Sequence, residues 1–202
     1  MKLIFLIFCC ILNFSSTQII FNCRFNTDFD WLIIGRVYMC TLQGNYSITT
    51  KNESVTNVIG EHKLFKNNNY VLALWMLYLE MFYLPIDITK RFRHIAGLTI
   101  NHSQLKEIHK SDLEPFYKLR ELYLIGNEIE IIEANLFEFN KRLELLWIDG
   151  NKIKRIQTGA FNGLEKLKYL NVREEKCMLK KVQYDHHAVL KLIEMIERKC
   201  FK

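Results

Sequence analysis

A 24-residue period runs through the middle of this 202-residue chain and limits its fold more than any other feature. Apolar positions recur in register, so that the unit beginning at Leu119 is repeated by the unit beginning at Leu143. The same register extends back to Val71 and forward to Val172. A single amphipathic helix would show a period of 3.6 residues and no such register. The sequence therefore predicts a stack of similar units.

Each unit has two parts. The first follows the spacing Leu-x-x-Leu-x-Leu and is followed by Asn127 or Asn151, whereas the two earlier units have Leu79 and Ser103 at that position. The second part repeats large apolar residues in two phases. The first phase consists of Leu113, Phe137 and Phe161. The second consists of Phe92, Phe116 and Leu164, with Asn140 as the exception between Phe116 and Leu164. One unit cannot bury its own apolar face, so we expect neighbouring units to share one core.

The pattern over residues 71–172 resembles the leucine-rich repeat in its extracellular 24-residue form, and the chain is similar to small secreted insect proteins of that kind. The resemblance implies an α/β solenoid. Each unit would add a short strand to a curved parallel sheet on the concave face, and an irregular or short-helical segment to the convex side. The repeat Asn would satisfy backbone groups inside each turn, so irregular turns are expected where Leu79 and Ser103 replace it.

The ends of the chain are assigned to a signal and to two caps. Residues 1–17 combine a charged start, an apolar run and small polar residues, which is typical of a secretory signal peptide. That run is shorter than the roughly 20 residues of a membrane-spanning helix, and no later run reaches this length. Residues 18–70 are assigned to an N-terminal cap with an irregular first repeat. Residues 173–202 are assigned to a C-terminal cap, with a helix beginning after Asp185.

Four cysteines follow the signal: Cys23, Cys40, Cys177 and Cys200. An even number in an exported chain predicts disulfides, and the residues alone leave three pairings open. A zinc site is disfavoured because the sequence contains no C-x-x-C pair. The resemblance, in which disulfide-bonded caps close both ends of the repeats, implies the pairs Cys23–Cys40 and Cys177–Cys200.

Three Asn-x-Ser sequons predict glycosylation at Asn45, Asn52 and Asn101. Asn101 belongs to the expected concave face, where a glycan would crowd the middle of the surface. Either Asn101 is unmodified, or a partner binds another region: the Tyr123, Trp147 and Tyr169 end, an edge or the convex face.

The residues between the repeat leucines are expected to face the concave surface, because side chains alternate along a strand. Aromatic residues recur there, and clustered exposed aromatics are enriched at interaction sites. The rings could instead shield strand edges or pack on each other. We predict that an extracellular protein ligand binds this face at Trp75, Tyr123, Trp147, Tyr169, Leu145, Ile125, Glu121 and Asp149.

Charge is concentrated near the C-terminus. Residues 151–202 contain 13 basic and 6 acidic residues, whereas the whole chain has a net charge of +6. Such a flank attracts acidic proteins, sulfated glycans or anionic membranes, although a solvated surface is the simpler interpretation. Its members include Lys152, Lys154, Arg155, Lys166, Lys168, Lys180 and Lys181.

Enzyme motifs are missing from the sequence, which has no H-E-x-x-H helix, no G-x-S-x-G elbow and no phosphate-binding glycine loop. His186 and His187 would point to different faces of a helix, which disfavours a shared metal. We expect no enzyme activity, cofactor, metal, membrane span or nucleic-acid partner. The leading hypothesis is a secreted recognition protein; the alternative is an extracellular-matrix or glycan-associated structural protein that uses the basic C-terminal flank.

Overall fold

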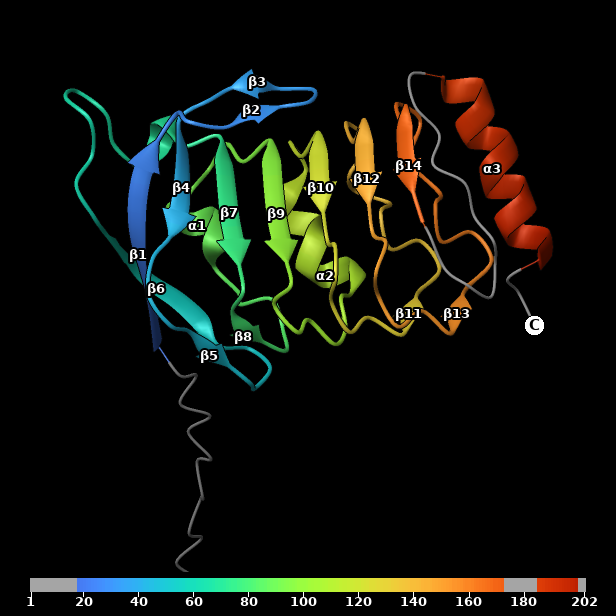
Figure 1. Ribbon diagram of the computed structural model, residues 1–202, viewed down its shortest axis with the longest axis horizontal. Coiled ribbons are helices and arrows are strands. Elements are labelled where there is room, and N and C mark those ends of the chain that lie inside the picture. The colour runs from blue at the N-terminus through green and yellow to red at the C-terminus, as the bar shows by residue number, and fades with distance from the viewer. Residues whose placement is uncertain (1–17, 173–184, 200–202) are drawn as a thin grey trace, which may run out of the picture.

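The computed structural model describes residues 18–172 and 185–199. Most of its strands lie side by side along the long axis (Figure 1). In chain order the elements are β1 (Gln18–Asn26), β2 (Asp30–Trp31), β3 (Gly35–Arg36), β4 (Met39–Leu42), β5 (Ser47–Ile48), β6 (Ser54–Ile59), η1 (Asn68–Tyr70), β7 (Ala73–Leu77), β8 (Glu80–Met81), α1 (Ile88–Arg91), β9 (Gly97–Asn101), α2 (Lys110–Leu113), η2 (Glu114–Phe116), β10 (Glu121–Tyr123), β11 (Ile131–Ile132), β12 (Leu145–Trp147), β13 (Arg155–Ile156), β14 (Tyr169–Asn171) and α3 (His186–Lys199).

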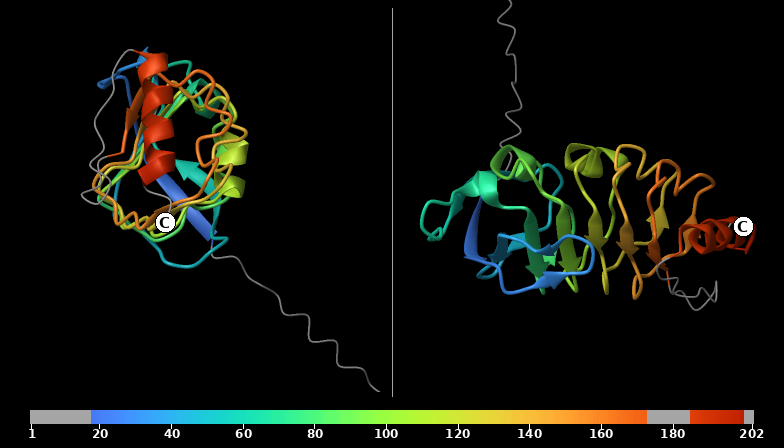
Figure 2. Two further views of the ribbon diagram at one scale, coloured as in Figure 1. Left: turned by 90° about the vertical axis from the view of Figure 1, so that its right-hand side faces the viewer. Right: turned by 90° about the horizontal axis from the view of Figure 1, so that it is seen from above.

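One eight-stranded sheet runs through the molecule in the order β14-β12-β10-β9-β7-β4-β1-β6. Its pairs are parallel except β1 with β4, and the repeat strands pair with residues one repeat apart, as in Leu98 with Leu122. Viewed along the long axis, successive coils overlie one another (Figure 2). The predicted 24-residue register and parallel sheet are therefore confirmed, and short helices occupy the second halves of two units. The architecture is that of a leucine-rich repeat.

The core is one column of apolar side chains from neighbouring coils. The central strand leucine is fully buried in every repeat: Leu74, Leu98, Leu122, Leu146 and Leu170. Large residues of the second halves complete the same cluster, which extends from Ile19 in β1 to Ile196 in α3. Burying one such side chain contributes about 1.5–3 kcal/mol, so no coil is stable without its neighbours.

A ladder of polar side chains ties the turns together one repeat apart. Asn127 Oδ1 accepts hydrogen bonds from the backbone N–H groups of Ser103 (3.0 Å) and Leu105 (3.2 Å), and its Nδ2 donates to Ile100 O (2.6 Å). Asn151 bonds in the same way to the unit before it. Ser103 fills part of this role, because its Oγ accepts from Leu79 N at 3.3 Å. Buried backbone groups are thereby satisfied in each turn.

The residue that precedes Leu79, Ser103, Asn127 or Asn151 has a left-handed backbone conformation in all four units. Gly126 and Gly150 have φ near +68°, and Tyr78 and His102 adopt the same conformation with φ of 55° and 51°. An added Cβ at Gly126 would also meet the exposed His102 ring, which would have to move. In the Ser103 unit Gln104 is also left-handed, a departure that the two Asn units do not share. The turn irregularity expected in this unit is thus local and small.

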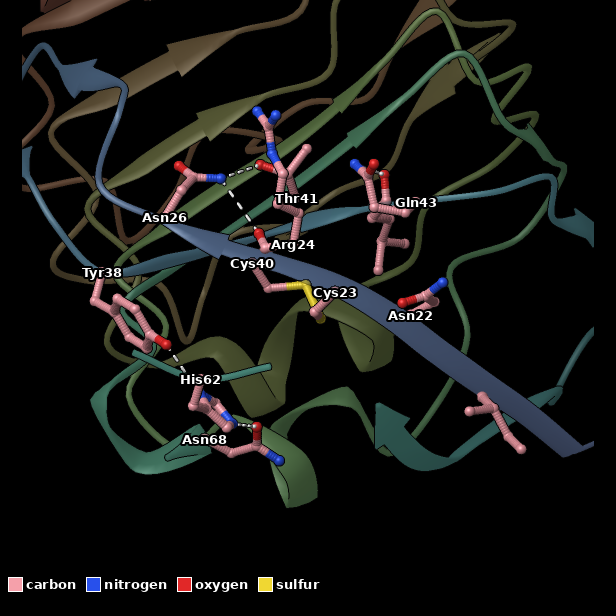
Figure 3. The surroundings of a disulfide bond; sticks show 12 residues. Asn22, Cys23, Arg24, Asn26, Tyr38, Cys40, Thr41, Gln43, His62 and Asn68 are labelled. Atoms are coloured by element: carbon pink, nitrogen blue, oxygen red, sulfur yellow. Dashed lines mark hydrogen bonds between the residues drawn. A yellow bond between two sulfur atoms is a disulfide. The ribbon is translucent and has the colours of Figure 1, made fainter. Parts of the chain in front are cut away.

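The N-terminal cap is a disulfide-bonded pair of strands. Cys23 of β1 and Cys40 of β4 form the predicted disulfide (Figure 3). β4 pairs in parallel with β7 and so joins the cap to the first repeat. β6 returns to pair with the other edge of β1. The second predicted disulfide, Cys177–Cys200, lies outside the described residues.

Helix α3 lies at the opposite end of the stack (Figure 1). Its first turn is capped by Asp185, whose Oδ1 accepts from His187 N at 2.9 Å. Val189, Leu192 and Ile196 point from one helix face into the shared core. None of the helices in the described ranges is long and apolar enough to cross a membrane.

Replacing Asn127 with Ala should lower the free energy of unfolding by about 2–4 kcal/mol, because buried N–H and C=O groups lose their partners. Chemical denaturation measures this loss. Asn69→Ala is the matched control, since Asn69 is exposed and its side chain is outside the ladder. Equal stabilities for the two variants would contradict the role given to Asn127.

Replacing both Cys23 and Cys40 with Ser should lower stability by about 3 kcal/mol, because the bridge closes a loop with a sequence separation of 17 residues. Thermal unfolding of the double variant, compared with the oxidised parent, provides the measurement. Reductant should destabilise the parent by at least this amount, because it would also break the predicted Cys177–Cys200 bridge. A parent whose stability does not respond to reductant would show that this bridge contributes little.

Candidate functional site

The aromatic row predicted from the sequence lies on one face of the sheet. Strand register aligns Trp75 with Thr99, Thr99 with Tyr123, and Tyr123 with Trp147. The Tyr123 and Trp147 ring centroids are 6.1 Å apart. The three aromatic side chains are each partly exposed, so the row borders solvent.

A short hairpin of the chain itself lies over the first half of this row. Strands β2 and β3 extend from the cap across β4, β7 and β9 (Figures 1 and 2). Trp31 is almost fully buried there, with its ring 6.2 Å from Trp75 and 5.8 Å from Tyr123. Phe29 packs edge-on against Trp75 at 4.2 Å. The N-terminal half of the sheet face that carries the aromatic row, the predicted concave face, is therefore occupied from within the molecule.

The small residues Ala73 and Gly97 make room for this hairpin. Both are buried, and both belong to the row of aligned strand residues that continues with Glu121, Leu145 and Tyr169. A Cβ on Gly97 would lie 2.8 Å from the Trp31 ring. Trp31 belongs to the segment predicted as the N-terminal cap, and the sequence pattern does not predict that it reaches the sheet face. The sequence signal for this contact is the pair of small residues, Ala73 and Gly97, at positions where the later units have Glu121 and Leu145.

Glu121 anchors the tip of the hairpin. Its Oε1 accepts hydrogen bonds from the backbone N–H groups of Ile33 (2.5 Å) and Ile34 (2.7 Å), and its Oε2 accepts from Tyr123 Oη (2.7 Å). The side chain is fully buried. Burial, and then the adjacent Glu121 carboxylate, raise the pKa of Tyr123, which keeps its hydroxyl protonated and donating. Hydrogen bonds to a charged acceptor are stronger than neutral ones, so this contact holds the hairpin closed.

The eight predicted ligand residues divide into two groups. Glu121, Leu145 and Tyr169 are buried, with exposed fractions of 0, 1 and 6 %, and their side chains offer no surface to a partner. The others keep partial exposure, although Phe29 covers part of Trp75. We refer to the remaining members beyond the hairpin as the open patch, which consists of Tyr123, Ile125, Trp147 and Asp149.

The border of the open patch is held by hydrogen bonds. Asn101 Oδ1 accepts from Ile125 N at 2.8 Å, which fixes the adjacent strand end. Leu32, between Trp31 and Ile33 at the hairpin tip, is about half exposed. The patch thus combines two aromatic rings, one aliphatic side chain and one carboxylate. This composition suits a protein surface better than a small polar molecule.

The three sequons differ in accessibility. Asn45 and Asn52 are exposed, whereas Asn101 is only partly exposed and engages Ile125. Ser103, the third residue of the Asn101 sequon, is fully buried.

Three lysines of the predicted basic flank pair with glutamates in the described repeats. Lys152 pairs with Glu128 (2.8 Å), Lys154 with Glu130 (2.6 Å) and Lys168 with Glu144 (2.9 Å). Burial alone would raise the pKa of Glu144, but hydrogen bonds from Lys168 and Arg120 outweigh it and lower that pKa. Lys180 and Lys181 lie outside the described residues. The basic surface is thus weaker than the sequence count suggests.

A cavity of about 550 Å³ lies away from the aromatic row, among the turns of the second halves. Its carboxylates are already paired: Glu107 with Lys51 and His109, and Glu133 with His109 at 3.2 Å. Within the described ranges no group of three or more His, Cys, Asp or Glu side chains is arranged to hold a metal.

Comparison with known proteins relates the chain to repeat proteins. No protein-family model matches it. Keratocan of Bos taurus is 31% identical over 123 residues, covering 58% of this chain and 34% of that protein. Toll-like receptor 10 of Bos taurus is 31% identical over 70 residues, covering 35% of this chain and 9% of the receptor. The chain thus spans about a third of the keratocan with which it aligns.

Solved structures with similar coils include the LRIM1/APL1C complex, which covers 77% of this chain and 31% of that chain at 17% identity and a TM-score of 0.45. The TLR13–ssRNA13 complex covers 56% of this chain and 17% of that chain, at 19% identity and a TM-score of 0.47.

Replacing Glu121 with Ala should release the hairpin, because Ile33 and Ile34 lose the acceptor that fixes them. Amide hydrogen exchange at these two residues should accelerate by about tenfold or more, while the core strands stay protected. Glu130→Ala is the control, since Glu130 is exposed on the other side of the coil. Unchanged exchange in the Glu121 variant would refute the anchoring role.

Proposed function

We propose that this protein is a secreted leucine-rich-repeat recognition protein that binds an extracellular protein ligand through the open patch. Binding would be non-covalent, and the protein would not be an enzyme. The observation that carries the proposal is the pair Tyr123 and Trp147, two ordered and partly exposed rings on a rigid sheet. Aromatic side chains on such a support lose little conformational freedom on binding and are enriched among energetic hot spots.

The hairpin supports this proposal by limiting where a ligand can sit. Because Trp31 and Phe29 cover the N-terminal half of the row, a partner would bind farther along the sheet and contact the hairpin tip. The closed hairpin also keeps Tyr123 in place through Glu121. Preorganisation of this kind lowers the entropic cost of association.

An extracellular location fits the Cys23–Cys40 disulfide, because such bonds persist in oxidising compartments. A signal peptide at residues 1–17 and glycans at Asn45 and Asn52 belong to the same proposal. Asn101 stays a predicted acceptor, but its sequon serine Ser103 is buried, as is Ser54 of the Asn52 sequon, so both sites would need modification before these turns fold. The matrix or glycan-associated alternative has less support, since three lysines of its basic flank already pair with glutamates.

The proposal predicts a crosslink that depends on Trp147. We expect a photo-crosslinking amino acid at Ile125 to give a discrete covalent product with an extracellular protein, and Trp147→Ala to weaken that product about tenfold or more. The same crosslinker at Phe139, which is exposed but not on the concave face, is the positional control. Equal products from Ile125 and Phe139, or a product insensitive to Trp147→Ala, would contradict the assigned surface.

A further inference from the structure

The most exposed apolar side chains of the described residues lie together on one projecting turn. Leu64 is 81% exposed and Phe65 is 89% exposed. The loop that follows β6 carries them away from the N-terminal end of the stack, in both the front view and the view from above (Figures 1 and 2). Side chains exposed to this degree contribute almost nothing to the core, so folding does not explain them.

The backbone at this turn is also unfavourable for its residue. Lys66 N donates to Lys63 O at 3.0 Å, which closes a turn with Leu64 and Phe65 at its centre. Phe65 has φ of +63°, a left-handed conformation that glycine adopts without steric cost and a bulky residue rarely occupies. Stability alone would favour glycine at this position. The chain instead places an exposed phenyl ring there.

The base of the loop is rigid. The His62 ring stacks on Phe25 with centroids 3.8 Å apart. Its two nitrogens contact Tyr38 Oη and Asn68 Oδ1, each at 3.0 Å (Figure 3). Lys63 N also donates to Tyr38 Oη at 3.1 Å. The turn is therefore presented on an ordered support, and little conformational entropy would be lost when it docks.

Positive charge and a half-exposed tyrosine lie just behind the two apolar side chains. Lys63 and Lys66 flank them directly, and Lys66 Nζ lies 4.5 Å from the Tyr38 ring centroid and 5.9 Å from that of Tyr70. Leu64 and Phe65 are thus bracketed by two lysines with a tyrosine ring nearby, and exposed Glu61 offsets one of the two positive charges. A bilayer surface offers partners for both kinds of side chain: acyl chains for the apolar ones and anionic headgroups for the ammonium groups.

We propose that this turn, residues 63–66, docks the protein on the surface of an anionic phospholipid bilayer. Leu64 and Phe65 enter the acyl boundary, and Lys63 and Lys66 bind headgroup phosphates and carboxylates. The tip is convex, and a fluid bilayer accepts it without a pocket of complementary shape. This attachment is separate from the open patch, so the protein docks on a membrane at one end and keeps its concave face free.

The test uses protein purified from the medium of expressing cells and vesicles of equimolar phosphatidylcholine and phosphatidylserine. The protein should sediment with these vesicles and bind more weakly to phosphatidylcholine alone. Phe65→Gly should reduce binding by about tenfold while preserving or raising the melting temperature, since it removes the ring and the left-handed strain together. Replacing Lys63 and Lys66 with Gln should weaken binding to the anionic vesicles only.

Tyr78→Gly provides a matched control, because Tyr78 is 78% exposed and also left-handed, with φ of 55°, but lies on a repeat turn. Its vesicle binding should equal that of the parent. The proposal is overturned if the parent does not sediment with anionic vesicles, if Phe65→Gly binds as the parent does, or if Tyr78→Gly loses binding equally. If the photo-crosslinker at Ile125 gives no product but the protein still binds anionic vesicles, only the proposed protein-ligand function is contradicted.

Discussion

Burial shared between neighbouring coils is the constraint on which the rest of this structure depends. Each unit contributes one strand and one apolar turn, and neither can exclude water alone. The fully buried leucines of five successive strands form a single column, which the disulfide-bonded cap covers at one end and α3 at the other. Once that column is formed, the residues between the leucines are fixed on the opposite face of the sheet, where they are available for other contacts.

The chain uses part of that face itself. A hairpin from the cap packs its tryptophan against the first aromatic residues of the row and is held by a buried glutamate. The concave surface is consequently divided into a closed half, which stabilises the cap on the repeats, and an open patch around Tyr123 and Trp147. The open patch is smaller than the full sheet face, but the anchored hairpin fixes its border. A preorganised surface loses less conformational entropy when a ligand binds.

Much of the fold was predictable because its physical signals are periodic. The leucine register gave the strands, their parallel pairing and the side of the sheet each residue faces, and the ladder role of Asn127 followed from its place in the repeat. Asn140, which breaks the apolar phase, proves to be a second polar tie: its Nδ2 donates to the carbonyls of Leu113 and Phe116. These two bonds join Asn140 to residues 27 and 24 positions earlier, and a hydrophobic pattern does not predict them.

The candidate site was harder to predict, because what covers a surface is a long-range property. Alternation places Glu121 and Leu145 on the concave side, but it cannot show that a segment about 88 residues earlier folds over Glu121. Similarly, a count of basic residues does not reveal which lysines pair with glutamates one repeat away. Local pattern therefore assigns faces correctly, whereas exposure depends on non-local packing.

The division of the concave face is tested most directly by proton–proton contacts in solution. Nuclear Overhauser effects between the ring protons of Trp31 and Tyr123 should be detectable, since the ring centroids lie 5.8 Å apart. Their detection in the free protein would establish that the hairpin lies over the aromatic row and leaves only the open patch. Absence of these effects, with a Trp31 ring that solvent quenchers reach freely, would contradict the account.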